Sequence, residues 1–166
     1  MEKRITGRVW VLGDDIDTDV IYPGKYLPIL DPVEMAKHAL EGYDVDFPSR
    51  IQRGDVIIAG MNFGSGSSRE QAATCLKSAG ITVIVAGSFA RIFFRNAVNQ
   101  GLPLVQVNVA DSFKDGDKIT IDFTEGFVMD AKGNKYKFPL LAESVQAILD
   151  EGGLIPAVRR KLGLIK

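Results

Sequence analysis

The middle of the chain alternates between short apolar runs and helix-like segments, and this alternation constrains the fold more than any other feature. The apolar runs lie at residues 55–59, 81–86 and 102–107. Runs that are apolar at successive positions are typical of strands buried on both faces of a parallel sheet. Helices are predicted between them at about 69–78 and 89–99, ended by Gly80 and Gly101, with Ser88 capping the second. This order predicts parallel pairing through right-handed crossovers.

The two ends of the chain add further elements. Residues 6–12 have the pattern of a strand. Period-two alternation of apolar and polar side chains marks three more segments, 118–123, 127–129 and 136–138. Such alternation predicts an antiparallel meander with one face in water. An amphipathic helix is predicted at about 141–149, ended by Gly152-Gly153, and a basic helix from Pro156. The predicted fold class is therefore α/β, a parallel sheet flanked by helices with an antiparallel β extension.

Residues 13–32 form a polar, proline-containing segment that precedes a short helix predicted at about 33–40. Asp31 is expected to cap this helix, with Pro32 in its first position. A connection of this length is unusual, and long loops in compact domains commonly carry function. With 166 residues, the chain has the length of one domain.

Composition excludes several classes of function. The 20 Lys and Arg residues balance the 21 Asp and Glu residues, and the net charge of −1 leaves no electrostatic footprint for nucleic acid. No apolar run approaches the roughly 18 residues of a membrane span, so a soluble cytoplasmic protein is expected. Cys75 is the single cysteine, which excludes a disulfide framework and a metal centre held by this chain's thiolates alone. We expect Cys75 to be a buried small residue, and His38, the single histidine, receives no functional role.

The segment with the strongest chemical signal runs from Asn62 to Gln71, between a predicted strand and a predicted helix. Its glycines allow sharp turns and a close approach of the backbone to a ligand. The unpaired N–H groups and the dipole at a helix start favour an anion. Arg69 adds a two-pronged donor suited to a carboxylate. We therefore predict a site for a small anionic ligand.

Two nucleotide-binding motifs do not fit this segment, and a structural interpretation stays open. A P-loop requires Gly-Lys-Ser/Thr, which is absent, and a dinucleotide fingerprint requires a third glycine where Arg69 stands. A capping box fits, because Ser67 with Glu70, or Ser68 with Gln71, has the right spacing. Two adjacent serines, however, exceed what one cap needs.

An acidic run at residues 14–19 invites comparison with a calcium loop. Asp15, Asp17 and Asp19 match the first ligand positions of an EF-hand. Val20 and Tyr26 stand where the motif requires glycine and glutamate, so the EF-hand is rejected. A turn rich in Asx hydrogen bonds is predicted instead.

These motifs, in this order, resemble the small-subunit family of 3-isopropylmalate dehydratase in the aconitase superfamily. The resemblance covers nearly the whole chain. It is carried by Asp14-Asp15-Ile16-Asp17-Thr18-Asp19-Val20-Ile21-x-Pro23, Tyr26-Leu27, Gly64-x-Gly66-Ser67-Ser68-Arg69-Glu70-Gln71-Ala72 and Ser88-Phe89-Ala90-Arg91-Ile92-Phe93. The resemblance implies a single swivelling β/β/α domain over residues 1–166, with a substrate-specificity loop at about 13–32. It also implies a partner, the large subunit, which carries a [4Fe–4S] cluster; no metal is assigned to this chain.

The implied reaction is a dehydration and rehydration that interconverts 2-isopropylmalate and 3-isopropylmalate in leucine biosynthesis. In the family pattern Ser67 is the catalytic base, which removes a proton beside a carboxylate while cluster iron takes the hydroxyl. Ser68 and Arg69 hold a carboxylate of this small hydroxy-acid substrate. A free serine is a poor base, and the helix start and Arg69 are expected to stabilise its anion.

The resemblance assigns substrate specificity to Tyr26, Leu27, Pro28 and Ile29. Related homoaconitases carry Arg at the first position after Tyr-Leu, where this chain has Pro28. An apolar wall suits an isopropyl group, whereas burying an unpaired carboxylate there is costly. We therefore predict 2-isopropylmalate over homocitrate. A homoaconitase-type or dual-specificity hydro-lyase small subunit and a non-catalytic anion-binding module remain alternatives, and the isolated chain is expected to self-associate through exposed apolar surface.

Overall fold

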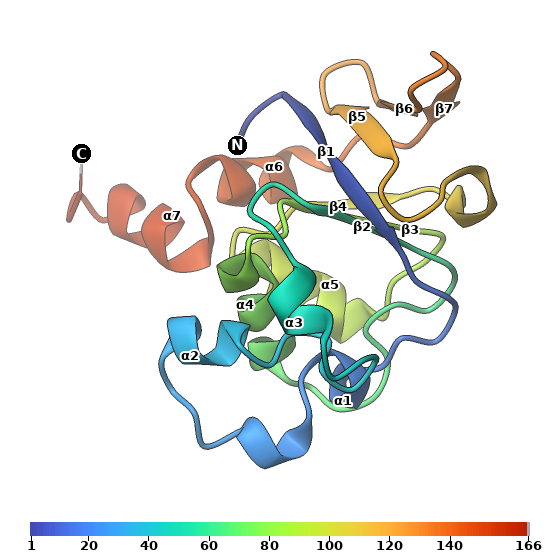
Figure 1. Ribbon diagram of the computed structural model, residues 1–166. Coiled ribbons are helices and arrows are strands. Elements are labelled where there is room, and N and C mark those ends of the chain that lie inside the picture. The colour runs from blue at the N-terminus through green and yellow to red at the C-terminus, as the bar shows by residue number, and fades with distance from the viewer. Residues whose placement is uncertain (166) are drawn as a thin grey trace.

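A seven-stranded sheet with the order β4-β3-β2-β1-β5-β6-β7 forms the centre of the computed structural model, which describes residues 1–165 (Figure 1). The strands are β1 (Arg4–Val11), β2 (Val56–Ala59), β3 (Val83–Ala86), β4 (Leu104–Gln106), β5 (Lys118–Asp122), β6 (Phe127–Met129) and β7 (Lys135–Lys137). The helices are α1 (Thr18–Ile21), η1 (Gly24–Tyr26), α2 (Pro32–Ala36), α3 (Phe47–Arg50), α4 (Glu70–Ala79), α5 (Arg91–Asn99), η2 (Ala110–Ser112), α6 (Glu143–Asp150) and α7 (Leu154–Lys161). Within residues 1–165, no helix is long and apolar enough to cross a membrane.

Strand β1 joins the two halves of the sheet. Its residues 9–11 pair in parallel with residues 56–58 of β2, while residues 4–8 pair antiparallel with β5. On one side β2, β3 and β4 continue in parallel, and on the other β5, β6 and β7 form an antiparallel meander. The predicted α/β class, with its parallel sheet and antiparallel extension, is confirmed. The sequence did not predict that one strand carries both kinds of pairing.

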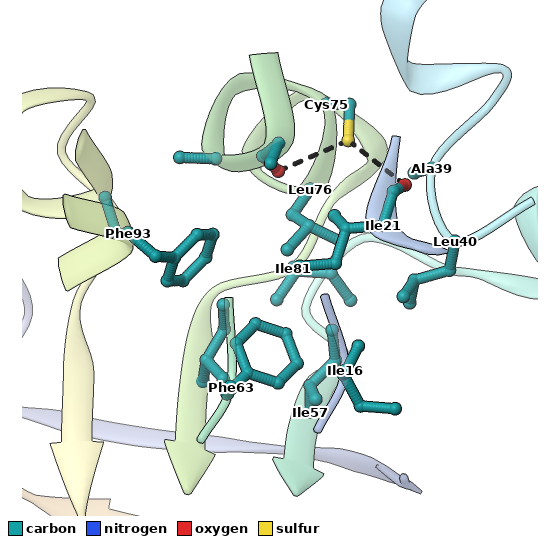
Figure 2. Close-up of a cluster of buried hydrophobic side chains, with 14 of the residues drawn as sticks. Ile16, Ile21, Ala39, Leu40, Ile57, Phe63, Cys75, Leu76, Ile81 and Phe93 are labelled. Atoms are coloured by element: carbon teal, nitrogen blue, oxygen red, sulfur yellow. Dashed lines mark hydrogen bonds between the residues drawn. The ribbon is translucent and has the colours of Figure 1, made fainter. Parts of the chain in front are cut away.

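The parallel strands are buried on both faces, as their apolar runs predicted. Every residue of β2 and β3 is buried. On one face Ile57 packs with Leu76 of α4 and Phe93 of α5, and Figure 2 shows these side chains converging with Phe63. On the opposite face Val56, Ile58 and Val83 pack with residues of the meander, including Ile119, Ile121 and Val128. The sheet is thus a fixed platform, and the loops that follow its strands are placed by it.

Helix ends follow the predictions in part. Gly80 ends α4 in the left-handed region with φ 114°, where its N–H reaches the carbonyls of the last turn. Asp31 caps α2 by accepting a hydrogen bond from the Val33 amide at 3.0 Å. The prediction that Ser88 caps α5 is wrong. The helix begins at Arg91, and the Ser88 hydroxyl accepts instead from the amide of Asn62 at 2.7 Å.

The segment at 13–32 contains two short helices. Asp17 caps α1, because its side chain accepts a hydrogen bond from the Val20 amide at 2.8 Å. The 3-10 helix η1 follows directly and ends at Tyr26. The Tyr22 hydroxyl donates to the Tyr26 carbonyl at 2.7 Å, which ties the two helices together. These hydrogen bonds connect successive turns of the segment to one another.

Asp55 fixes the start of β2 to β1 through a buried carboxylate. Arg8 donates to both of its oxygens, at 3.2 and 2.8 Å, and the Trp10 indole donates at 2.7 Å. The Gln52 amide adds a further bond at 2.8 Å. Burial acts to raise the pKa of Asp55, but these donors outweigh it and hold the pKa below its ordinary value. The carboxylate is therefore ionised at neutral pH and fully bonded.

Replacing Asp55 with Asn tests this anchor. We expect Asp55→Asn to lower the free energy of unfolding by about 2 kcal/mol, because hydrogen bonds to a charged group are each worth about 1.5–3 kcal/mol. Urea unfolding of the isolated chain measures the change. Asp111→Asn, at an exposed position in η2, is the matched control and should shift the value by less than about 0.5 kcal/mol. Equal unfolding midpoints for the two variants would contradict the prediction.

Candidate functional site

Three loops meet at the edge of the sheet where the parallel strands end. They follow β1, β2 and β3, and backbone hydrogen bonds connect them in sequence. The Gly60 amide donates to the Gly13 carbonyl at 3.1 Å, and the Gly87 amide donates to the Gly60 carbonyl at 2.9 Å. Phe63 and Phe89 form an isolated parallel bridge beyond the strand ends. In open α/β sheets this carboxyl edge is where ligands bind.

The glycine-rich loop before α4 is hydrogen-bonded to the acidic run at residues 14–19. The Gly64 amide donates to the Ile16 carbonyl at 2.7 Å, and the Thr18 amide donates to the Ser65 carbonyl at 2.8 Å. Gly64 has φ 85°, and a Cβ atom there would lie 2.2 Å from Cγ of Phe93. The close approach for which glycine is needed is therefore to Phe93 of α5, where the sequence had suggested a ligand.

Ser67 and Ser68 are exposed and do not cap the helix. Helix α4 begins at Glu70, its N-cap residue is Arg69, and no side chain makes a cap hydrogen bond. The capping-box interpretation that the sequence left open is therefore wrong. The two hydroxyls stand just before the first turn of a ten-residue helix, where its N–H groups and dipole favour negative charge.

Arg69 is oriented by two hydrogen bonds to residues of the segment at 13–32. Its Nη1 donates to Asp19 Oδ1 at 2.9 Å and to the Tyr22 carbonyl at 3.1 Å. The Arg69 side chain is 16% exposed, whereas that of Asp19 is 69% exposed. The hydrogen bond from Arg69 and a second from the Gly24 amide hold the pKa of Asp19 below its ordinary value. Asp19 is therefore ionised at neutral pH, and its hydrogen bond fixes the direction of the guanidinium.

The Nε atom of Arg69 is buried without a hydrogen-bond acceptor among residues 1–165. A buried N–H of a charged group that lacks an acceptor is costly, and such groups are rare in folded proteins. The hydrogen bonds of this guanidinium within residues 1–165 are made by Nη1 alone, so the donors of Nη2, which is not among the buried unpaired atoms, remain for a ligand group. This is the chemistry expected of an arginine that binds a carboxylate.

The predicted specificity residues begin on η1, close to this arginine. The Gly24 amide donates to the Asp19 carboxylate at 3.0 Å, so η1 and Arg69 share one anchor. Leu27 and Pro28 are exposed, while Ile29 is half-buried against the helix-side core. Tyr26 differs from them, because its hydroxyl is already bonded to Glu41. The start of the specificity segment and Arg69 are thus linked through the carboxylate of Asp19.

The prediction of an Asx-rich turn for the acidic run is confirmed at Asp17 only, because the other carboxylates bond mainly to distant loops. Besides the Asp17 cap and the Asp19 pair, Asp14 accepts a hydrogen bond from the Met61 amide at 2.8 Å. The Asn62 side chain donates to Asp15 Oδ1 at 3.0 Å. These carboxylates fasten loop to loop. Among residues 1–165, no group of three or more His, Cys, Asp or Glu side chains is placed to hold a metal ion.

Sequence reasoning missed two residues beside the specificity segment. His38 and Glu41 interact with each other, with Nδ1 and Oε2 2.6 Å apart, and both contact Tyr26. The only signal in the sequence was their spacing of three residues, which places two side chains on one face of a helical turn. Cys75, in contrast, is buried as predicted, with its sulfur 3.3 Å from the Ala72 carbonyl (Figure 2).

Comparisons with known proteins agree with one another. The aconitase C-terminal domain family matches residues 31–109. A 3-isopropylmalate dehydratase small subunit from Methanopyrus kandleri is 50% identical over 163 residues, which cover 97% of this chain and 96% of that protein. A homoaconitase small subunit from Methanothermobacter thermautotrophicus is 47% identical over 93% of this chain and 91% of its own. The crystal structure of a 3-isopropylmalate dehydratase from Methanocaldococcus jannaschii superposes with a TM-score of 0.93 at 43% identity, covering 97% of this chain and 96% of that one.

The absence of a serine cap predicts how stability responds to substitution. Ser67→Ala should change the free energy of unfolding by less than about 0.5 kcal/mol, the usual range for surface positions. Asp31→Ala, which removes a real side-chain cap from α2, should cost about 1 kcal/mol and is the positive control. Urea unfolding of both variants measures the difference. A loss for Ser67→Ala as large as that for Asp31→Ala would restore the capping interpretation.

Proposed function

Because this chain belongs to the family of 3-isopropylmalate dehydratase small subunits, we propose that it is the small subunit of such a hydro-lyase. With a large subunit it interconverts 2-isopropylmalate and 3-isopropylmalate by dehydration and rehydration, as a cytoplasmic enzyme of leucine biosynthesis. The sequence and structure comparisons confirm the family that the motifs predicted. The observation that carries the proposed chemistry is a pair of serine hydroxyls at the start of α4 that do not cap the helix and that precede an oriented arginine.

Ser67 is the proposed catalytic base. In the dehydration, its alkoxide takes the proton from the carbon beside a carboxylate, and the electron pair of the C–H bond becomes the double bond of an enoic acid. The hydroxyl on the neighbouring carbon leaves with the electron pair of the C–O bond, a departure that the cluster expected on the large subunit would assist as a Lewis acid. Rehydration in the opposite sense delivers the proton to the carbon that lost the hydroxyl and the hydroxyl to the carbon that lost the proton. Serine acts as a base only where its anion is stabilised. The N–H groups at the start of α4 and the positive charge of Arg69 supply that stabilisation.

Ser68 and Arg69 are the proposed carboxylate-binding residues. Arg69 is held by Asp19 and Tyr22 through Nη1, which leaves the Nη2 donors for a substrate oxygen. A planar guanidinium that is oriented before the substrate arrives loses little freedom on binding. Its role is therefore to fix the carboxylate next to the carbon from which Ser67 removes the proton.

The residues of this chain do not fit an iron–sulfur cluster. Such clusters are held by three or four thiolates, and this chain has one cysteine. Burial raises the pKa of the Cys75 thiol, so the sulfur keeps its proton and is not a metal ligand at neutral pH. The [4Fe–4S] cluster expected in this family is therefore proposed to lie on the large subunit, and the partner of this chain is that subunit.

Substrate selection is assigned to the segment after Tyr26. Leu27, Pro28 and Ile29 carry no charge, and Leu27 is 37% exposed and thus available to a ligand. The isopropyl group of the proposed substrate requires an apolar wall, and an additional carboxylate would be left unpaired there. The 47% identity to a homoaconitase small subunit supports a second candidate function, that of a hydro-lyase acting on a longer tricarboxylate.

The catalytic assignment is tested by Ser67→Ala in the complex with the large subunit. We expect kcat to fall at least about 100-fold with KM changed less than threefold, because removal of the base leaves the carboxylate contacts in place. Ser78→Ala, at the other end of α4, is the matched control and should retain full turnover. Anaerobic assay of the reconstituted complexes gives both constants. Near-normal turnover by Ser67→Ala would reject Ser67 as the base, whereas an unmodified complex without any turnover would point to a non-catalytic anion-binding module.

The substrate assignment is tested at Pro28. The unmodified complex should have the higher kcat/KM for 2-isopropylmalate than for homocitrate, and Pro28→Arg should shift the ratio toward homocitrate by at least about 10-fold, since a paired carboxylate avoids a desolvation cost of more than 1 kcal/mol. Pro28→Gln, which adds length without charge, is the control. A preference of the unmodified complex for homocitrate would instead identify the hydro-lyase of the homoaconitase type.

A further inference from the structure

Tyr26 is clamped on two sides by His38 and Glu41, which lie in the turn after α2. The Tyr26 hydroxyl donates to Glu41 Oε1 at 2.5 Å. The imidazole of His38 stacks on the Tyr26 ring, with centroids 3.6 Å apart and planes 15° from parallel. His38 Nδ1 lies 2.6 Å from the second oxygen of Glu41, which closes a three-membered arrangement. We refer to Tyr26, His38 and Glu41 as the tyrosine clamp.

The carboxylate of the clamp is charged. Burial acts to raise the pKa of Glu41, but the hydrogen bonds from Tyr26 and His38 outweigh it and keep the pKa below its ordinary value. The Glu41 side chain is 18% exposed and that of His38 25%. Hydrogen bonds to a charged, largely buried acceptor are stronger than those between neutral groups. Lys25 adds to this assembly, because its Nζ lies 5.1 Å from the centre of the Tyr26 ring. The contacts therefore hold Tyr26 in one orientation.

The turn that carries the clamp is itself fixed to α1. The Leu40 amide donates to the Ile21 carbonyl at 2.7 Å. A Cβ atom at Gly42 would lie 2.7 Å from Cα of Val20, so this turn runs directly against the α1 backbone. Leu40, with φ 60°, is one of the non-glycine residues in the left-handed region, and its side chain is fully buried. His38 and Glu41 therefore stand on a rigid support.

The same unit reaches the arginine of the candidate site. Helix α1 carries Asp19, which holds Arg69, and the Gly24 amide of η1 bonds to that same carboxylate. The carbonyl of Tyr26 accepts from the Tyr22 hydroxyl at 2.7 Å. The backbone of Tyr26 is thus connected to Arg69 through Tyr22, and its side chain is bonded to the other two clamp residues. Leu27 follows it directly in the chain.

We propose that His38 and Glu41 are positioning residues for substrate selection: through Tyr26, they fix where the segment Leu27-Pro28-Ile29 stands relative to Arg69. This inference rests on the proposed function, since it concerns the site of that same reaction. Neither side chain touches the substrate. Both act by restricting the segment that forms the apolar wall, so that it is in place before the substrate binds.

Tyr26→Phe is the central test, because it removes the hydroxyl that donates to Glu41 and keeps the ring that stacks on His38. In the complex with the large subunit, we expect KM for 2-isopropylmalate to rise about fivefold with kcat within twofold, because part of the free energy of the lost hydrogen bond to the charged Glu41 is then taken from binding. The kcat/KM ratio of 2-isopropylmalate to homocitrate should fall by a similar factor. Tyr43→Phe is the matched control. Its ring packs edge-on against Phe47 outside the clamp, and the side chain is 47% exposed.

Glu41 provides a second, graded test. Glu41→Ala should reproduce the change in KM and in the substrate ratio, and Glu41→Gln should restore part of it, because an amide oxygen still accepts from Tyr26. Backbone amides of residues 24–27 and 29 should exchange hydrogen faster in Tyr26→Phe than in Tyr43→Phe, and this exchange is measured on the isolated chain without an activity assay. These results together would support positioning by the clamp.

The outcomes separate this inference from the proposed function. If the unmodified complex isomerises 2-isopropylmalate while Tyr26→Phe and Glu41→Ala keep its KM and substrate ratio within twofold, the clamp has no part in selection. A loss of kcat for both substrates alike, with an unchanged ratio, would show a merely structural role and overturn the inference too. If the unmodified complex has no isomerase activity, the proposed function fails, and the inference fails with it.

Discussion

Two backbone hydrogen bonds, from Gly64 to Ile16 and from Thr18 to Ser65, hold the candidate site together. They join loops that follow β1 and β2, neighbouring parallel strands, so the sheet delivers both loops to the same edge. Backbones approach this closely only where side chains are absent. At Gly66 a Cβ atom would lie 3.2 Å from the Thr18 hydroxyl, and at Gly64 it would collide with Phe93. Every proposed role depends on this junction, because it sets Asp19 on one loop opposite Arg69 on the other.

The hydrogen bond from Arg69 to Asp19 orients the guanidinium, and it uses a donor that could otherwise bind a ligand. A free guanidinium on the surface would sample many rotamers, and ordering it would cost a binding substrate up to about 2 kcal/mol. In this structure the Nη1 donors of Arg69 are bonded within the chain. The Arg69 side chain is only 16% exposed. Asp19 is the more exposed partner of the pair. The tyrosine clamp extends the same principle to the neighbouring segment, since it fixes an exposed apolar stretch through contacts made behind it.

Much of the fold was predictable because its signals are local. The apolar runs that form β2 and β3, the period-two meander, the Asp31 cap and Gly80 at the end of α4 each depend on a few neighbouring residues. The double pairing of β1 was not predictable, since it depends on which distant strands arrive beside it. The same applies to Ser88, whose hydroxyl serves the Asn62 amide across two loops. Motifs located the serines and Arg69, but only the three-dimensional structure shows that the serines leave α4 uncapped and that His38 and Glu41 enclose Tyr26.

The position of the serines also bears on why this chain needs a partner. A serine base works only where water is excluded and the stabilising donors face it without competition. Ser67 and Ser68 are exposed, and a cavity of about 500 Å³ lies at the opposite edge of the sheet, beside Ile81 and Leu102 at the starts of β3 and β4. This chain thus presents an oriented arginine and hydroxyls on an open surface. That geometry supports the proposed division of the site between two subunits, in which the large subunit covers these polar groups and excludes water from them.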